Sequence, residues 1–190
     1  MQDITHVSGG PTKPEIIAVS LSKLDLADGN TFVDIGCGTG AVSIAAARMR
    51  HNLCIYAIDA RAEAIDTAAH NFEKFLIPNI TLIHGEASKI LDERQDLGII
   101  DCAFVGGTKN IRRVLEILRE KEVKRIVVNA VRIETVVRTI KTMQELGIFD
   151  EAVHISVSSS TPIGGETMFK PDNPVYIISG KSELQVSKEK

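Results

Sequence analysis

Three glycines with one residue between neighbours form the segment of this sequence best suited to bind a ligand. Gly36, Gly38 and Gly40 lie in the segment Val33-Asp34-Ile35-Gly36-Cys37-Gly38-Thr39-Gly40. Its first residues belong to an apolar run that is typical of a strand, and a helical pattern begins directly after Gly40. Glycine lets the backbone turn sharply and approach a ligand without an intervening Cβ atom, and a helix N-terminus offers free N–H groups to an anion or carboxylate. Because the spacing differs from the dinucleotide fingerprint, the loop predicts a ligand site without identifying the ligand.

An acidic residue at the end of the next apolar run is suited to hold a ribose. Asp59 closes the run Ile55-Tyr56-Ala57-Ile58-Asp59, and its two carboxylate oxygens can accept hydrogen bonds from both hydroxyls of an adenosine. The alternative is a helix cap, because Asp59 also precedes Ala60-Arg61-Ala62, where a helical pattern begins.

Two further strand ends would complete such a site. Glu86 and Ala87 follow the third apolar run, where Glu86 could accept from an adenine amine and the amide of Ala87 could meet a ring nitrogen. Glu86 is equally suited to cap the helix that follows. After the fourth run, Gly106 and Gly107 leave room at a reacting centre.

The elements that must position these residues alternate between strand and helix patterns, which indicates an α/β protein with a parallel sheet covered by helices on both faces. The expected strands are Thr31–Ile35, Cys54–Ile58, Ile80–His84, Ile99–Val105 and Arg125–Asn129. The expected helices are Ala41–Arg50, Ala62–Phe75, Lys109–Glu120 and Ile133–Leu146, the last capped by Gly147.

The pattern changes after Gly147. Two strand-like runs, Ala152–Ser158 and Val175–Ser179, are joined by Ser159–Pro174 without a helix, so we expect them to form an antiparallel pair. The length of 190 residues fits one domain over residues 1–190, and no repeat or linker divides it.

Composition disfavours several classes of function. A net charge of −3 provides no overall attraction to nucleic acid or anionic lipid. No apolar run is long enough to span a bilayer, and no export signal is visible at the N-terminus, so we expect a cytoplasmic protein without a membrane partner.

Cysteines and histidines give no sign of a disulfide framework, a metal site or a hydrolase. Cys37, Cys54 and Cys102 are widely spaced and are expected to be small buried hydrophobic residues. The histidines, at positions 6, 51, 70, 84 and 154, lack metal-ligand spacing and a Ser or Cys partner. For His84 we expect core packing.

Together these residues resemble the class I S-adenosylmethionine-dependent methyltransferases, roughly from Thr12 to Gly180. A narrower resemblance, to the precorrin C15-methyltransferases, rests on short motifs: Gly10-Pro11-Thr12-Lys13, Val105-Gly106-Gly107, Asn129-Ala130-Val131 with Glu134, and Met168-Phe169 before Asn173-Pro174-Val175. The broader resemblance implies a Rossmann-like, seven-stranded, mostly parallel sheet with a C-terminal antiparallel strand pair. The narrower one implies methylation of C15 of a cobalt-precorrin and decarboxylation of its C12 acetate, in cobalamin biosynthesis.

The resemblance also implies roles for individual residues. Thr12, the loop of Gly36, Cys37, Gly38, Thr39 and Gly40, Asp59 and Ala87 would hold S-adenosylmethionine, with Glu86 beside the adenine. The family is commonly described as tetrameric, so we expect a homotetramer.

Substrate contacts are expected from residues near the strand carboxyl ends. Lys13, Arg132 and Lys170 could hold the carboxylates of a tetrapyrrole, whereas Gly106 and Gly107 would give it clearance. No residue is marked as a catalytic base, and an electron-rich macrocycle carbon could attack a methyl sulfonium directly. No resident metal is expected, because the cysteines and histidines lack metal-ligand spacing.

Two alternatives remain open. The same fold methylates RNA, proteins and other small molecules. The absence of an Asn/Asp-Pro-Pro-aromatic stretch after the fourth strand disfavours amide and exocyclic-amine acceptors. The second alternative is a non-catalytic protein that binds S-adenosylmethionine, which would show binding without turnover.

Overall fold

The structure is a computed structural model that describes residues 4–6 and 12–182. Its helices are α1 (Pro14–Leu24), α2 (Ala41–Met49), α3 (Ala62–Lys74), α4 (Ala87–Glu93), α5 (Ile111–Glu120) and α6 (Ile133–Glu145), with a short 3₁₀ turn, η1 (Gln95–Leu97). Its strands are β1 (Thr31–Ile35), β2 (Cys54–Asp59), β3 (Ile80–His84), β4 (Cys102–Val105), β5 (Arg125–Ala130), β6 (Phe149–Ile155), β7 (Ser158–Ile163), β8 (Glu166–Pro171) and β9 (Val175–Lys181).

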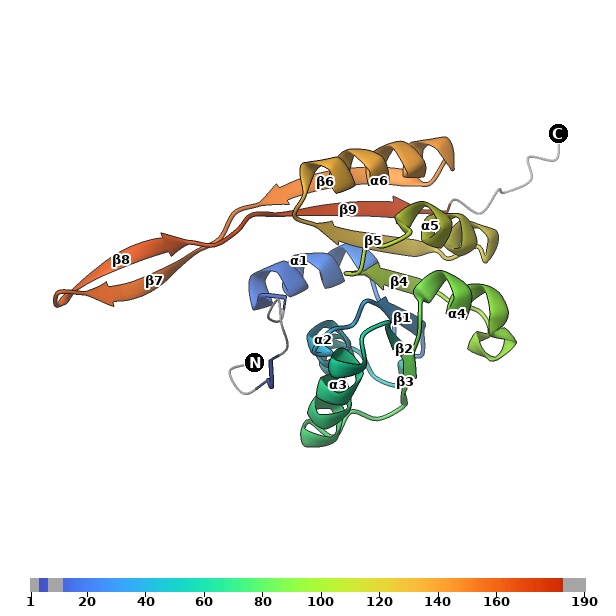
Figure 1. Ribbon diagram of the computed structural model, residues 1–190, viewed down its shortest axis with the longest axis horizontal. Coiled ribbons are helices and arrows are strands. Elements are labelled where there is room, and N and C mark those ends of the chain that lie inside the picture. Colours follow the sequence, from blue (N-terminus) through green and yellow to red (C-terminus); the bar gives the residue numbers. More distant parts are fainter. Residues whose placement is uncertain (1–3, 7–11, 183–190) are drawn as a thin grey trace.

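Seven strands form one mixed sheet in the order β3-β2-β1-β4-β5-β9-β6 (Figure 1). The first five pair in parallel, and β9 lies antiparallel between β5 and β6. The predicted fold class, including the antiparallel pair near the C-terminus, is therefore confirmed. Strand order reverses between β1 and β4, and in such sheets the carboxyl ends of the strands beside the reversal form the ligand crevice.

Helices cover both faces of the sheet and bury an apolar layer on each. On one face, α1, α2 and α3 contribute Ile16, Ile44 and Phe72 to a core that includes Phe32 of β1. On the other face, α4, α5 and α6 pack against the sheet through residues such as Leu91, Leu115, Val136 and Met143. Because both faces are covered, the central strands are apolar without alternation.

One predicted strand begins later than expected. The apolar run from Ile99 suggested a strand over residues 99–105, but β4 starts at Cys102. Gly98 has a φ of +60° and the side chain of Ile99 is 80% exposed, so the chain is still turning there. Pairing with β1 starts after Asp101, whose carboxylate accepts from the amide of Thr31 at 2.9 Å.

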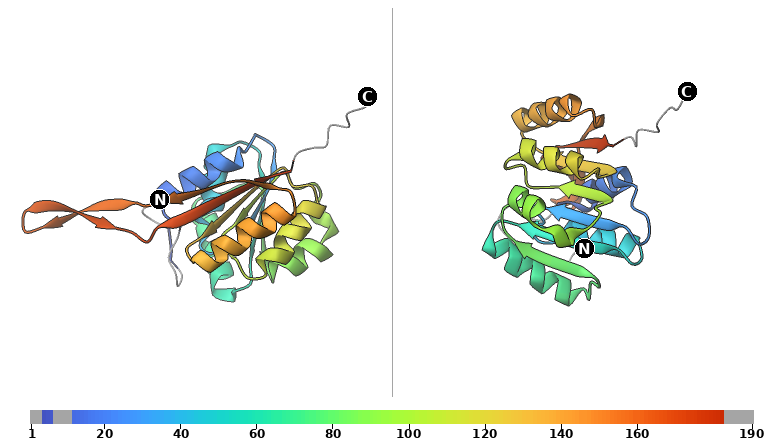
Figure 2. Two further views of the ribbon diagram at one scale, coloured as in Figure 1. Left: turned by 90° about the horizontal axis from the view of Figure 1, so that it is seen from above. Right: turned by 90° about the vertical axis from the view of Figure 1, so that its right-hand side faces the viewer.

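The segment Ser159–Pro174 lacks a helix, as expected, but it is not an irregular connection. It forms most of the hairpin of β7 and β8, which pair from Ser158 with Pro171 to Ile163 with Glu166. Figures 1 and 2 show this hairpin projecting away from the sheet. Every residue of both strands is exposed, and no buried face supplied a hydrophobic signal in the sequence.

Among the described residues no helix is long and apolar enough to cross a membrane. The expectations of a cytoplasmic location and of one domain over residues 1–190 stay predictions.

Candidate cofactor and substrate site

The glycine loop turns from β1 into α2 and is held by close backbone packing. Gly36 has a φ of +74°, and a Cβ atom built on it would lie 2.4 Å from the backbone nitrogen of Gly107. Gly40 has a φ of +77°, and a Cβ atom there would lie 2.3 Å from the ring of Phe72 on α3. Glycine is therefore required at both positions by neighbouring protein atoms as well as by the backbone conformation.

A cavity of about 610 Å³ opens beside this loop at the carboxyl ends of β1, β2 and β4. This volume lies in the usual range for small-molecule sites. The cavity brings together predicted residues from separate parts of the chain, namely Gly36, Asp59, Glu86, Ala87, Gly106, Gly107 and Arg132. It also includes Arg61 and Lys109, for which the sequence analysis predicted no role.

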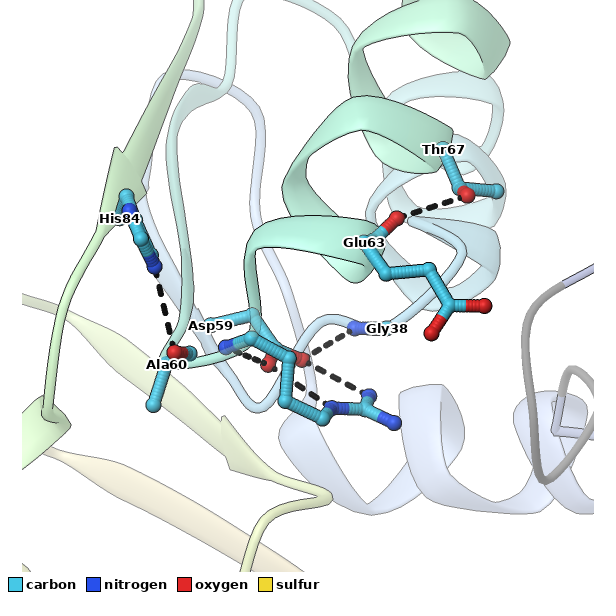
Figure 3. Close-up of polar contacts among 7 residues, drawn as sticks. Gly38, Asp59, Ala60, Glu63, Thr67 and His84 are labelled. Carbon is cyan, nitrogen blue, oxygen red and sulfur yellow. Dashed lines mark hydrogen bonds and ion pairs between the residues drawn. The ribbon is translucent and has the colours of Figure 1, made fainter.

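Asp59 is buried, and both of its carboxylate oxygens accept hydrogen bonds (Figure 3). Oδ1 accepts from the backbone amide of Arg61 at 3.0 Å and from its Nε at 3.1 Å. Oδ2 accepts from the amide of Gly38 at 3.0 Å and from Nη2 of Arg61 at 3.2 Å. Burial opposes ionisation of Asp59, but the hydrogen bonds from Arg61 and Gly38 outweigh it and hold the pKa of the carboxyl below its usual value.

Glu86 adopts the helix-capping role that the sequence left open. It is the N-cap of α4, and its Oε2 accepts from the amide of Lys89 at 3.1 Å, while its Oε1 accepts from Nδ2 of Asn110 at 3.3 Å. Because Glu86 also lines the cavity, a contact with an adenine amine stays a prediction.

His84 was expected in the core, and that expectation was wrong. Its side chain is exposed at the end of β3, with Nε2 3.2 Å from the carbonyl oxygen of Ala60. β3 is an edge strand of the sheet, and its last residue lies outside the layer that the helices cover.

The rest of the glycine loop is buried or partly buried. Cys37, Gly38, Thr39 and Gly40 line neither this cavity nor the second one described below, and their cofactor role stays a prediction. Burial raises the pKa of the Cys37 thiol, so the thiolate is not formed at neutral pH.

Asp34, two residues before the loop, is fully buried on β1. Its Oδ2 accepts from the hydroxyl of Ser43 at 2.6 Å, while its Oδ1 has no hydrogen-bond partner among the described residues. Burial raises the pKa of this carboxyl from 3.8 to about 6, and the hydrogen bonds of Ser43 limit the rise.

Asn71 of α3 connects the glycine loop to the start of the chain. Its buried Nδ2 donates to the carbonyl of Thr39 at 2.9 Å and to that of Thr5 at 3.1 Å, while its Oδ1 accepts from the amide of Thr5 at 3.0 Å. Asn71 therefore joins Thr5 to the loop, and the contact between Thr5 and Asn71 spans 66 positions and left no signal in the sequence.

A second cavity, of about 570 Å³, adjoins the first at the ends of β4 and β5. The two cavities share Gly106, Thr108 and Arg132 in their walls. The second is also lined by Thr12, Lys13, Asn129 and Asp172 among others. Gly10 and Pro11, which precede Thr12 in the quoted motif, lie outside the described residues.

The cations proposed for substrate binding are not equivalent. Arg132 is exposed in the wall of both cavities. Lys13 lines the second cavity but forms an ion pair with Asp172, at the base of the hairpin. Lys170 is exposed on β8, paired in register with Ser159, and lines neither cavity. Arg132 is therefore the cation best placed to meet ligands in both cavities.

Asn129 and Asp172 line the second cavity although the sequence analysis assigned neither of them a role; Asn129 was quoted only as part of a motif. Asn129, near the end of β5, has Nδ2 3.0 Å from the hydroxyl of Ser20 on α1 and lines the second cavity. The position of Asn129 at the end of an apolar run was the signal that could have identified it. Asp172 lies in a polar segment and gave no comparable signal. No group of three or more His, Cys, Asp or Glu side chains suited to a metal occurs in the described parts of the chain.

Comparison with known proteins places this geometry among precorrin-modifying enzymes. The sequence matches the family described as "Precorrin methyltransferase domain" over residues 5–181. A protein of Methanosarcina acetivorans is 65% identical over 183 residues, which cover 96% of this chain and 100% of the relative. It is named "Probable cobalt-precorrin-6B C(15)-methyltransferase (decarboxylating)". A Methanocaldococcus jannaschii protein of the same name is 37% identical and covers 88% of each chain.

Solved structures show the same arrangement of elements. A precorrin-6y C5,15-methyltransferase from Geobacter metallireducens GS-15 has a TM-score of 0.88 at 29% identity, covering 95% of this chain and 96% of its own. A precorrin 8W decarboxylase from Methanobacterium thermoautotrophicum has a TM-score of 0.86 at 28% identity, covering 95% and 98%.

Proposed function

Because this chain belongs to the precorrin methyltransferase family, we infer that it is a decarboxylating C15-methyltransferase that acts on a cobalt-precorrin in cobalamin biosynthesis. The adjoining cavities give this function its strongest support from the geometry. One offers a carboxylate at the end of β2, the other offers Lys13 and Arg132, and they meet at Gly106, Thr108 and Arg132. A nucleoside ligand and a polyanionic acceptor can therefore lie side by side.

The cofactor that we propose is S-adenosylmethionine, whose methyl sulfonium supplies the electrophile. The residues of the first cavity fit its adenosine part: Asp59 offers two acceptor oxygens for ribose hydroxyls, and Ala87 offers a backbone amide close to the end of β3. The backbone of Gly36 faces the same cavity without a Cβ atom.

The protein's contribution to methyl transfer is placement. Gly36 and Gly107 pack against one another, which fixes part of the wall of the first cavity, next to the shared residue Gly106. Holding two reactants in line can supply about 7 to 11 kcal/mol of the barrier, so accurate placement is a sufficient role without a general base for this step.

The acceptor that we propose is a tetrapyrrole bound in the second cavity, with its carboxylates near Arg132 and Lys13. A substrate carboxylate would have to share Lys13 with Asp172 or displace it. Arginine can bind a carboxylate through two parallel hydrogen bonds, so Arg132 is expected to make the stronger contact.

We also propose that copies of this chain associate through the hairpin of β7 and β8. Ile163, Met168 and Phe169 on it are 57%, 41% and 69% exposed. A two-stranded hairpin is only marginally stable by itself, and apolar side chains that project from the body favour contact with a second copy. Sedimentation of the wild type and of Phe169→Lys tests this, and a monomeric wild type would contradict it.

One turnover experiment tests the enzyme function. The protein is incubated with methyl-labelled S-adenosylmethionine and cobalt-precorrin-6B, and mass spectrometry follows the gain of one labelled methyl group and the loss of one carbon dioxide. We expect both changes in the wild type and in Arg119→Ala, an exposed position on α5 away from both cavities. We expect neither in Asp59→Ala at limiting cofactor. Cofactor binding without any methyl transfer would instead support a non-catalytic binding protein.

A further inference from the structure

The side chain of Arg61 occupies the acceptor oxygens that the proposed site needs for ribose. Each oxygen of Asp59 already accepts two hydrogen bonds, one from a backbone amide and one from the Arg61 guanidinium. An ionised carboxylate has about four lone-pair positions. The carboxylate is therefore saturated in this structure, and two ribose hydroxyls can bind only if existing donors leave.

The donors differ in how easily they can leave. The amides of Gly38 and Arg61 belong to the glycine loop and to the start of α3, and their positions are fixed by the fold. The Arg61 side chain is 55% exposed and reaches Asp59 from the cavity wall. Rotation about its flexible side-chain bonds frees one position on each carboxylate oxygen without moving the backbone.

Helix capping does not account for an arginine at this position. Arg61 is the N-cap of α3, a place where Ser, Thr, Asp or Asn accepts a hydrogen bond from the first turn. Arginine has no acceptor atom, and its positive charge is unfavourable near a helix N-terminus. Among the described residues, its guanidinium donates its hydrogen bonds to Asp59.

We propose that Arg61 is a positioning residue that competes with the ribose of the adenosine ligand for Asp59. In the free protein it keeps the carboxylate ionised and oriented, and it returns to Asp59 as the adenosine product leaves. The ion pair between Arg61 and Asp59 thereby lowers the affinity of the protein for the adenosine ligand and speeds release of the adenosine product. This inference rests on the proposed use of S-adenosylmethionine.

The expected size of the effect follows from exposure. An ion pair with one exposed partner contributes little, so loss of the competitor should tighten binding by only about 2- to 5-fold. Salt screens such a pair. The affinity of the wild type should therefore rise toward that of an Arg61 variant as ionic strength increases, whereas the variant should lack this part of the salt response.

Calorimetry and stopped-flow release of S-adenosylhomocysteine test the proposal on the full-length protein. Arg61→Ala should lower both the Kd and the dissociation rate by about 2- to 5-fold at low salt. Arg61→Lys keeps the charge without the two-pronged geometry and should restore part of the competition. Arg119→Ala is the control for loss of an exposed arginine at a helix. Thermal melting reports on folding, and Arg61→Gln replaces Arg61→Ala if the latter does not fold.

The outcomes separate this inference from the proposed function. If the wild type does not bind S-adenosylhomocysteine, the cofactor assignment fails. If the wild type binds but Arg61→Ala binds equally or more weakly at every salt concentration, the competition is refuted and Arg61 instead contacts the ligand or has no part in binding it. A helix-stabilising role alone would alter melting but not the salt dependence of the Kd.

Discussion

Replacement of Asp59 by alanine removes a buried carboxylate that faces the proposed adenosine cavity. Hydrogen bonds to a charged group contribute about 1.5 to 3 kcal/mol, so the loss of ribose contacts should raise the Kd for S-adenosylmethionine by roughly 10- to 150-fold. The same substitution frees Arg61 and leaves the amide of Gly38 without this acceptor. Any loosening of the glycine loop would place the change toward the upper end of that range.

Asp59→Asn is the matched variant, because it keeps the shape and one carbonyl acceptor while it loses the charge. Its Kd should rise by about 2- to 10-fold, the scale of a neutral hydrogen bond. The wild type should bind equally well from about pH 5 to about pH 8, because the lowered pKa keeps Asp59 ionised throughout that range.

Titration calorimetry measures the Kd, and circular dichroism with thermal melting shows whether each variant is folded. A folded Asp59→Ala protein whose Kd stays within about twofold of the wild-type value would refute the assignment of Asp59 to ribose binding, because changes of that size are common for substitutions without a specific role. Asp59 would then only position Arg61 and Gly38, and another group would have to hold the ribose.

The remaining predictions concern the glycines beside the first cavity, the buried carboxyl of Asp34 and the exposed Arg132. Gly36→Ala should cost about 2 to 5 kcal/mol of folding free energy in urea denaturation, because its Cβ atom would lie 2.4 Å from the Gly107 nitrogen. Gly38→Ala should cost only about 1 to 2 kcal/mol, because its Cβ atom would lie 3.7 Å from its nearest neighbour. Equal losses in the two variants would contradict the packing argument. Because the pKa of Asp34 is raised from 3.8 to about 6, its contribution to stability is full below about pH 4 and is lost as the pH rises through about 6. In parallel denaturation curves, Asp34→Asn should therefore be up to about 3 kcal/mol more stable than the wild type at neutral pH, and equally stable at pH 4. Gly107→Leu should reduce methyl transfer and cofactor affinity together in kinetic and binding assays, since its Cβ atom would lie 3.2 Å from the Cα of Gly36; an unchanged Kd would show that the loop adapts. Arg132→Ala should raise the KM for the precorrin by about 3- to 10-fold with a smaller change in kcat, and a change in kcat alone would exclude a binding role.

Sequence patterns predicted the five parallel strands, which helices cover on both faces, but gave no range for α1 or α4 and placed the strand that is β6 three residues too late. The helices predicted from Ala41 and Ala62 each end one residue before their predicted limit, because apolar periodicity and packing on the sheet determine them together. The strand predicted from Ile99 started too early, since an apolar side chain at a turn looks the same in sequence as one in a strand. The hairpin of β7 and β8 was missed because none of the described residues buries either of its strands.

The residues that line the first cavity were predictable where they lie at the carboxyl ends of strands. Asp59 ends β2 and Gly36 follows β1, at the edge of the sheet where ligands bind. Arg61 was missed although it had a signal, namely an arginine where a helix N-cap favours an acceptor. The clearance expected at Gly107 needs correction, since its closest neighbour is the backbone of Gly36 and not open space.

The position of β9 constrains the order in which this protein can fold during synthesis. β9 lies between β5 and β6 although it follows both in the chain, and β6 has no other neighbour in the sheet. Until residues 175–181 have left the ribosome, β5 presents an open edge and β6 has no strand to pair with, while Ile177 and Ile178 are missing from the two apolar layers. A nascent chain that pauses within the hairpin would therefore expose an unfinished sheet, and co-translational folding should reach the protease-resistant state only after the last strand emerges.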